Sequence, residues 1–208
     1  MKRFKLFAIT LLCLINLSIY SQESKKEITG EEWDKLIQLL SADKWNDAEK
    51  LSLKYLNKFN DKDDSLADPA IVRYMYIRCV AAKLGNKVYD KDEAVKKVAK
   101  FIGKPIITPP RTFNQECMFN CLRLTEDKKC MYSCSSNDLH TVIHDFERYE
   151  MADTTFLDDV SAIEGKDIRI AAFVKTIDAG GYAMPRLEIV FEKAFVWDEG
   201  NDEGDDNE

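Results

Sequence analysis

The sequence predicts an α+β protein built mainly from helical hairpins, with a disulfide-tied helical hairpin and a C-terminal antiparallel β-hairpin. Three observations lead to this fold class. Apolar residues recur at helical spacing, between capping signals, over residues 30–103. Two matched cysteine pairs follow, and beyond residue 167 the apolar residues alternate as they do in strands. The predicted segments are a signal peptide (1–21), helical hairpins (22–103), a linker (104–111), a cysteine-stapled helical region (112–151), a short helix with the β-hairpin (152–197) and a disordered acidic tail (198–208).

The first 21 residues have the pattern of an export signal. Three basic residues precede an apolar stretch over residues 6–19, and Ser21 offers the small residue at which a signal peptidase cuts. The apolar stretch falls short of the roughly 20 residues that span a bilayer, which argues against an anchoring helix. We therefore expect an exported protein, periplasmic or secreted, that is not inserted in a membrane after cleavage.

The charge of the chain is concentrated at its end. The formal net charge is −7, and removal of the three basic signal residues makes it −10. Seven acidic residues in the tail account for all but −3 of this charge, so the body is close to neutral. A body of this kind lacks the basic patch that dominates nucleic-acid binding, and we expect no nucleic-acid partner. The tail itself is predicted to be solvated and disordered.

Four helices are predicted in the first half of the chain. Thr29 and Glu32 form a capping box in front of the first helix, and the second follows a short polar break. Asp68 and Pro69 are predicted to cap and open a third helix, which is strongly apolar and is expected to be central. The fourth begins after Asp90 and ends at a Gly-Lys-Pro sequence.

The two helical hairpins share an internal pattern. Trp45-Asn46-Asp47-Ala48 and Lys91-Asp92-Glu93-Ala94 each open the second helix of a hairpin. This pattern resembles the start of the second helix in tetratricopeptide-type repeats, over about residues 30–103. The two alanines stand 46 residues apart, whereas that family repeats after roughly 34. The resemblance implies a concave surface that binds a peptide or protein segment. The alternative is an ordinary four-helix core without a groove.

The cysteine region is expected to form a stapled helical hairpin. Cysteines four residues apart stand about 6 Å apart along one helical face, so two antiparallel helices pair Cys117 with Cys134 and Cys121 with Cys130. Four cysteines allow three pairings, and this nested one keeps both helices regular. The spacing is similar to that of disulfide-stapled α-hairpin peptides, over about twenty residues. Such disulfides persist in exported proteins, because these proteins reach an oxidising compartment.

A metal site is the alternative for the same region. His140 and His144 are the two histidines of the chain and are also four residues apart. Together with Cys130 and Cys134 they offer four ligands for a tetrahedral zinc ion. Against this, residues 138–149 are predicted to form a helix with a buried apolar stripe of its own, and exported thiols tend to oxidise. The favoured prediction has no cofactor, and a protein that binds zinc or copper is the alternative.

The C-terminal part is predicted to form two strands. Residues 168–174 and 187–195 alternate apolar and polar side chains, across a loop over residues 178–186. A lone hairpin is marginal in water, so it must pack on the helices, meet a further strand or pair through its edge with another chain. The run over residues 165–170 is similar to strands of oligonucleotide- or oligosaccharide-binding (OB) barrels. About forty residues cannot supply the five strands of such a barrel, and we do not assign that fold.

The sequence contains no catalytic signature. The cysteine pairs lack the C-x2-C spacing of thioredoxin-like centres, and no glycine-rich phosphate loop is present. We therefore predict a non-enzymatic protein that binds another envelope or secreted protein. The candidate binding surfaces are the edge of the β-hairpin and a helical surface formed by Trp33, Trp45, Tyr74 and Tyr76. The alternatives are the metal-binding protein and an enzyme whose site is assembled from dispersed carboxylates.

Overall fold

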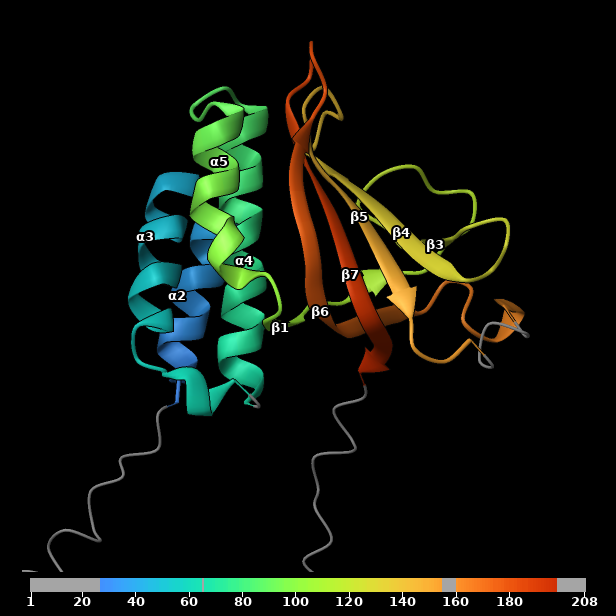
Figure 1. Cartoon of the computed structure of the whole chain (residues 1–208), viewed down its shortest axis with the longest axis horizontal. Coiled ribbons are helices and arrows are strands. Elements are labelled where there is room, and N and C mark those ends of the chain that lie inside the picture. The colour runs from blue at the N-terminus through green and yellow to red at the C-terminus, as the bar shows by residue number, and fades with distance from the viewer. Residues whose placement is uncertain (1–26, 65, 155–159, 198–208) are drawn as a thin grey trace, which may run out of the picture.

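A layer of helices stands beside a strongly curved β-sheet in the structure, which is a computed structural model (Figure 1). The structure describes residues 27–64, 66–154 and 160–197. The predicted signal peptide and acidic tail lie outside these residues. One buried apolar core runs through both layers, from Leu36 among the helices to Phe191 in the sheet. The helices and the sheet are therefore parts of one folding unit.

The helical layer confirms the four predicted helices. Its elements are α2 (Gly30–Ser41), α3 (Trp45–Leu56), η1 (Asp61–Asp63), α4 (Ala67–Gly85), α5 (Lys91–Val98) and η2 (Ala99–Phe101). The predicted capping box forms, because the Thr29 hydroxyl accepts from the Glu32 N–H and the Glu32 carboxylate accepts from the Thr29 N–H. The Asp90 carboxylate likewise accepts from the Glu93 N–H at the start of α5.

Helix α4 is the central element, as predicted. It packs against α3 and α5 on one side and against β5, β1 and β7 on the other. Side chains around its whole circumference are buried, which is typical of a helix that is apolar all round. Asp68 does not cap this helix. The N-cap is Leu66, and the Asp68 carboxylate accepts from the Ile28 N–H at 2.8 Å, which ties the start of the described chain to α4.

The sheet contains seven strands within the described residues. They are β1 (Pro105–Ile107), β2 (Arg111–Thr112), β3 (Arg123–Leu124), β4 (Cys130–Ser136), β5 (Ile143–Met151), β6 (Asp167–Gly180) and β7 (Arg186–Trp197). The strand order is β1-β6-β7-β5-β4-β3, and β2 also pairs with β6. The β5–β7 pair is parallel, and the other pairs are antiparallel.

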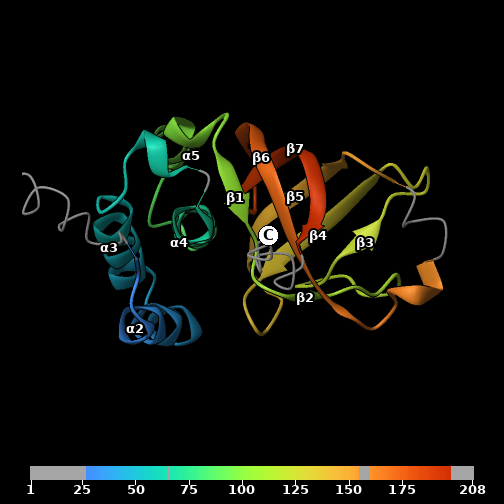
Figure 2. The same ribbon diagram turned by 90° about the horizontal axis from the view of Figure 1, so that it is seen from below.

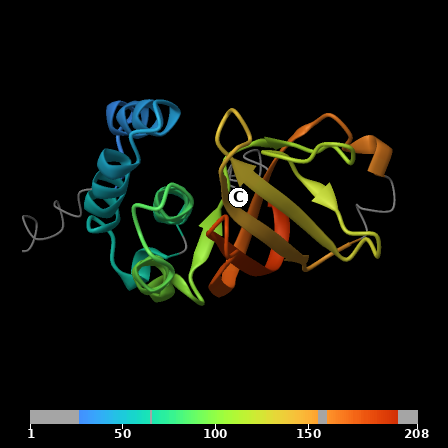
Figure 3. The same cartoon turned by 90° about the horizontal axis from the view of Figure 1, so that it is seen from above.

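The sheet closes on itself into a barrel. One side of β2 pairs with β6. On the other side, the Leu122 N–H donates to the Thr112 carbonyl at 3.0 Å, and the Asn114 N–H donates to the Leu122 carbonyl at 2.9 Å. Leu122 leads directly into β3, which pairs with β4. Seen from below and from above, the strands surround a common interior, with α4 and α5 beside the barrel and α2 and α3 farther out (Figures 2 and 3).

The path of the chain around the barrel follows a known topology. β1 and β2 can be taken as two parts of one bent strand, which is the first main strand of the barrel. The second, third, fourth and fifth main strands are β4, β5, β6 and β7. Their order around the barrel is second, third, fifth, fourth and first, with the third and fifth parallel, and β3 lies between the second and the first. Apart from β3, this strand order is similar to that of the five-stranded Greek-key OB barrel. The likeness concerns topology, and topology alone assigns no function.

The predicted fold class is therefore wrong. The protein has four α-helices and a seven-stranded mixed sheet among its described residues, where mainly helical hairpins with one β-hairpin were expected. The supposed stapled helices over residues 112–151 contain β3, β4 and β5, and the supposed linker contains β1. The two C-terminal strands do pair, from Arg169 with Trp197 to Gly180 with Arg186, but as members of the barrel. Of the short helix predicted before them, the described part is η4 (Val160–Ala162).

None of the described helices has both the length and the apolar character needed to cross a bilayer.

Candidate functional site

The outer face of β4, β5, β7 and β6 carries a hollow of about 480 Å³. Strand register aligns its lining residues in two rows that run across the four strands. The first row is Tyr132, Arg148, Val190 and Thr176, and the second is Phe146, Glu188 and Asp178. The second row continues on β4 at Cys134, which does not line the hollow. Most of these side chains are exposed or half-buried, whereas Cys134 is buried. We call this surface the outer groove, defined by Tyr132, Phe146, Arg148, Thr176, Asp178, Glu188 and Val190.

Arginine side chains cover the two aromatic rings of the outer groove. The Arg123 guanidinium lies over the Tyr132 ring, 4.5 Å from its centroid, and the Arg186 guanidinium lies 4.4 Å from the centroid of Phe146. A guanidinium that rests on an aromatic ring loses side-chain freedom before any ligand arrives. Both guanidinium groups are therefore held in place beside the groove.

The charges of the outer groove are separated across its width. Three guanidinium groups, those of Arg123, Arg148 and Arg186, lie on the β4 and β5 side, where two of them cover the rings. The carboxylates of Asp178 and Glu188 lie on the β6 and β7 side. Arg186 Nη2 and Glu188 Oε1 meet at the seam, 2.9 Å apart. The groove therefore presents a basic half and an acidic half.

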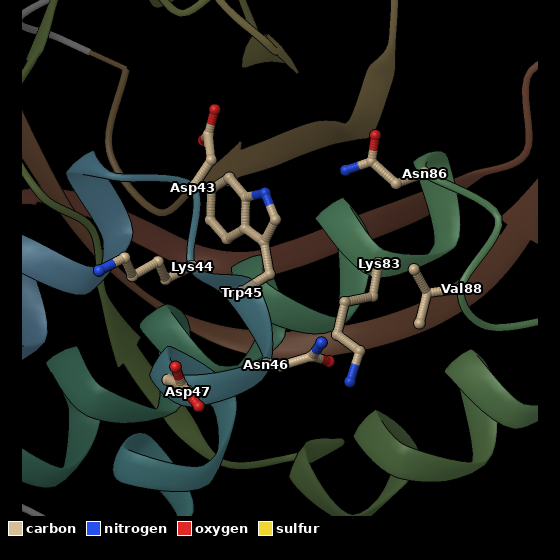
Figure 4. A pocket seen from close by; sticks show the side chains of 8 residues that line it. All are labelled: Asp43, Lys44, Trp45, Asn46, Asp47, Lys83, Asn86 and Val88. Carbon is tan, nitrogen blue, oxygen red and sulfur yellow. The ribbon is translucent and has the colours of Figure 1, made fainter.

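A second hollow, of about 280 Å³, surrounds Trp45 (Figure 4). The turn between α2 and α3 forms one wall, and the end of α4 with the turn that follows it forms the other. The lining residues are Asp43, Lys44, Trp45, Asn46, Asp47, Lys83, Asn86 and Val88. Acidic, basic and amide side chains are mixed here, and Lys83 is already bound to Glu49 at 2.7 Å. We call this the Trp45 hollow.

His144 lies behind the Trp45 hollow, at a β-bulge. Ser135 pairs with Asp145 and Ser136 with Ile143, so His144 is the extra residue of β5. Its ring meets the Trp45 ring edge-on, with centroids 5.5 Å apart, and neither ring nitrogen has a hydrogen-bond partner. Burial, with the Arg78 charge nearby, lowers the pKa of His144 to about 4. The ring is therefore neutral at physiological pH.

The four predicted protein-binding residues do not form one surface. Tyr74 and Tyr76 are buried, so neither is available to a partner. Trp33 is half-buried against the apolar core. Of the four, Trp45 is the residue that lines a hollow. The edge of the C-terminal hairpin is not available either, because β7 is paired on both sides and β6 pairs with β7, β1 and β2.

A buried polar cluster that sequence reasoning missed joins α4 to the barrel interior. Arg111 Nη1 lies 2.5 Å from Glu147 Oε2 and donates to the Ser133 hydroxyl at 2.6 Å. The Tyr74 and Tyr149 hydroxyls donate to the Glu147 carboxylate at 2.7 and 2.8 Å. Arg111 also donates to the Tyr74 hydroxyl. Each polar group of this cluster is thus satisfied by another.

The electrostatics of the cluster follow from its burial. Burial raises the pKa of Tyr74 well above its usual value. Burial alone would lower the pKa of Arg111, but the charge of Glu147 raises it well above the usual value. A second pair stands beside the first, with Arg78 Nη1 2.6 Å from Asp145 Oδ2. The Arg78–Asp145 pair connects α4 to β5, and the Arg111–Glu147 pair connects β2 to β5. The role of both pairs is structural.

The cysteines are not paired as predicted. The structure has a disulfide between Cys117 and Cys121, with Cα atoms 6.3 Å apart, in the segment between β2 and β3. Cys130 and Cys134 are free and buried in β4. Burial raises the pKa of the Cys134 thiol to about 11, so it is protonated at neutral pH. The expected nested pairs required two helices, and this segment is a loop and a strand.

The residues of the alternative metal site are apart. His140 is exposed and stacks on Phe119, with ring centroids 4.8 Å apart, and its Nδ1 lies 2.7 Å from the Ser136 hydroxyl. His144 faces Trp45 instead. In the described part of the chain, no three His, Cys, Asp or Glu side chains are grouped closely enough to hold a metal ion.

Comparison with protein-family models, curated proteins and solved structures finds no match to this chain. The function must therefore be argued from the geometry of its surfaces.

Proposed function

We propose that this protein is a non-enzymatic interaction module that binds an extended peptide segment of another envelope or secreted protein in the outer groove. The observation that carries the proposal is the alignment of aromatic, basic and acidic side chains across four strands, in a hollow of about 480 Å³. Binding sites of this kind combine aromatic anchors with a few oriented charges.

The preorganised arginines favour a partner with carboxylates. Arginine recognises carboxylates through paired hydrogen bonds, and the Arg123 and Arg186 side chains are already ordered on Tyr132 and Phe146. Little side-chain entropy then remains to be lost on binding. We expect acidic side chains of the partner to lie over the β4 and β5 half of the groove.

The acidic half of the groove favours a peptide over a nucleic acid. A phosphate backbone that crosses the groove would meet Asp178 and Glu188, which repel it. Stacking of bases would also require displacement of the guanidinium groups that cover the rings. A peptide that carries acidic, apolar and basic side chains in succession meets no such conflict.

Side chains rather than strand addition must supply the binding energy. Strand addition needs an unpaired sheet edge. The strands beneath the groove are β4, β5, β7 and β6, and each has a neighbour on both sides in the closed barrel. A peptide in the groove is therefore recognised by its side-chain pattern.

Selection of phage-displayed random dodecapeptides on the purified protein tests the proposal. We expect enriched peptides whose affinity falls at least about tenfold in Phe146→Ala and in Arg148→Glu, the loss of about 1.4 kcal/mol that is usual for an interface anchor. The matched control is Val88→Glu, which places a charge in the Trp45 hollow. No enrichment, or peptides that are insensitive to both groove variants, would refute the proposal. Loss of binding in Val88→Glu alone would move the site to the Trp45 hollow.

A further inference from the structure

A third hollow, apolar and separate from the outer groove, lies where α4 begins. It has a volume of about 430 Å³ and is walled by the start of α4, by β1 and by parts of β6 and β7. We call it the apolar hollow, defined by Leu66, Ala70, Ile107, Ala171, Phe173 and Phe195. Its size is within the range of small-molecule sites, about 300–1,000 Å³.

Small residues create the apolar hollow. Ala70 on α4 and Ala171 on β6 form, with Ile107, a small buried cluster apart from the main core. Alanine at these facing positions leaves space that a larger side chain would fill. Leu66 and Phe195 keep 45% of their surface exposed at the mouth. Exposed apolar side chains at the rim of an apolar hollow are typical of a ligand-binding groove.

The charges beside the apolar hollow favour an anion. Asp64 is the one charged residue among its lining residues, and both of its oxygens are held, by Arg73 Nη2 and by Lys104 Nζ at 2.6 Å each. The negative charge of Asp64 is therefore compensated. Lys193 supplies a positive charge at the rim, because its Nζ lies 5.7 Å from the centre of the Phe173 ring.

We propose that the apolar hollow binds a single-chain amphiphile with an anionic head, of the class of long-chain carboxylic acids. The alkyl chain lies between Ala70 and Ala171 and covers Leu66 and Phe195. The carboxylate lies at the rim, within reach of the positive charge of Lys193. This inference does not depend on the outer groove, which is a different surface with a different ligand.

Fluorescence of dansylaminoundecanoic acid in the presence of the protein tests the proposal, with all ligands below their micelle concentrations. We expect saturable binding and displacement by decanoate and dodecanoate. Dodecanoate should bind about tenfold more tightly, because each buried methylene contributes about 0.8 kcal/mol. Dodecanol and dodecyltrimethylammonium should compete at least about tenfold less well. Absence of saturable binding, or equal competition by all three head groups, would overturn the proposal.

Three variants test the location. Ala171→Phe fills the hollow and should abolish binding. Leu66→Ser removes one wall and supplies a favourable N-cap to α4, so it should weaken binding while the fold is kept. Lys193→Glu should weaken dodecanoate about tenfold and leave dodecanol unchanged. The control is Lys91→Glu, at the start of α5, which follows the other end of α4. Unchanged binding in Leu66→Ser, or a change of oligomeric state in place of lost binding, would refute the site.

Discussion

Arg111 and Glu147 meet in the interior of the barrel, with 2.5 Å between Nη1 and Oε2. Tyr74 of α4 donates to the other oxygen of the same carboxylate at 2.7 Å. The three side chains come from β2, β5 and the helical layer, so a single cluster joins three parts of the chain. Loss of this cluster is expected to loosen the helices and the barrel together.

We predict that Glu147→Ala lowers the free energy of unfolding by about 3–5 kcal/mol, because it leaves Arg111 charged and unpaired in the interior. Tyr74→Phe should cost about 1–2 kcal/mol, since it removes hydrogen bonds and keeps the ring. Urea unfolding followed by circular dichroism measures both. The control is Glu150→Ala, whose exposed pair with Lys175 should contribute at most about 1 kcal/mol. A loss at Glu147 no larger than the loss at Glu150 would contradict this prediction.

We predict that stability falls as the pH falls from about 6.5 to about 4. The pKa of His144 is about 4 in the folded protein and 6.5 without the fold. Between these values the unfolded chain binds a proton that the folded chain does not, so acid favours unfolding. The free energy of unfolding is expected to fall by about 3 kcal/mol over this range, and His144 causes no loss above the unfolded-state pKa of 6.5.

Urea unfolding at pH 7 and pH 4.5 measures the effect of His144. The control is His144→Phe, which keeps a ring against Trp45 and cannot titrate. The charged groups near His144 include Arg78 and Asp145, which are present in both proteins. Equal losses of stability in the two proteins would show that another group is responsible.

We predict that the oxidised protein contains one disulfide among Cys117, Cys121, Cys130 and Cys134. Denatured protein alkylated without reductant should carry label on Cys130 and Cys134, and a peptide map should show Cys117 linked to Cys121. Reduction should lower the free energy of unfolding by about 2 kcal/mol, since the closed loop is short. Recovery of all four cysteines unlabelled, with Cys117 linked to Cys134 and Cys121 to Cys130 in the peptide map, would instead favour the nested pairs that the sequence suggested.

We predict that Gly85→Ala destabilises the protein by about 1–3 kcal/mol. A Cβ at Gly85 would lie 2.8 Å from the Ile143 carbonyl oxygen, a backbone atom beside the bulge that holds His144. The matched control is Gly30→Ala, where a Cβ meets no atom within 4 Å and alanine favours the helix. Thermal unfolding of both variants measures the difference. An equal or higher melting temperature for Gly85→Ala would contradict the close packing of α4 on β5.

The helical half of the fold was predictable from the sequence because its signals are local. Thr29 and Glu32 are three residues apart, and Asp90 lies directly before the helix that it caps. Apolar side chains at helical spacing then mark the buried faces. The central position of α4 follows in the same way, since its apolar residues surround the helix.

The barrel was not predictable because its interior is partly polar. Along β5, Asp145, Glu147 and Tyr149 point inward, whereas Phe146 is on the outer face. This reverses the alternation by which a half-buried strand is recognised. The four-residue spacing of Cys130 and Cys134 fits one face of a helix and also one face of a strand. The OB-like topology was set aside because these strands were mistaken for helices.

The candidate site was missed for a related reason. The outer groove depends on register across four strands, and no sequence spacing places Tyr132 beside Arg148 or Val190 beside Thr176. Trp45 was predicted to contribute to a helical binding surface; it lines a hollow, and its role in binding stays a prediction. Tyr74 was assigned to a surface, but it is buried and donates to Glu147, which is 73 residues away in the sequence.

Barrel closure also decides the order in which the protein can fold. The Thr112 hydroxyl donates to Asp167 at 2.7 Å across 55 residues of sequence, next to the pairing of β2 with β6. Contacts of this range form late, because a long loop must close before they contribute energy. Helix α4 and the Arg111–Glu147 pair are therefore expected to stay uncovered until β6 and β7 are in place. The chain is expected to fold slowly and as a whole, after its last strand is complete.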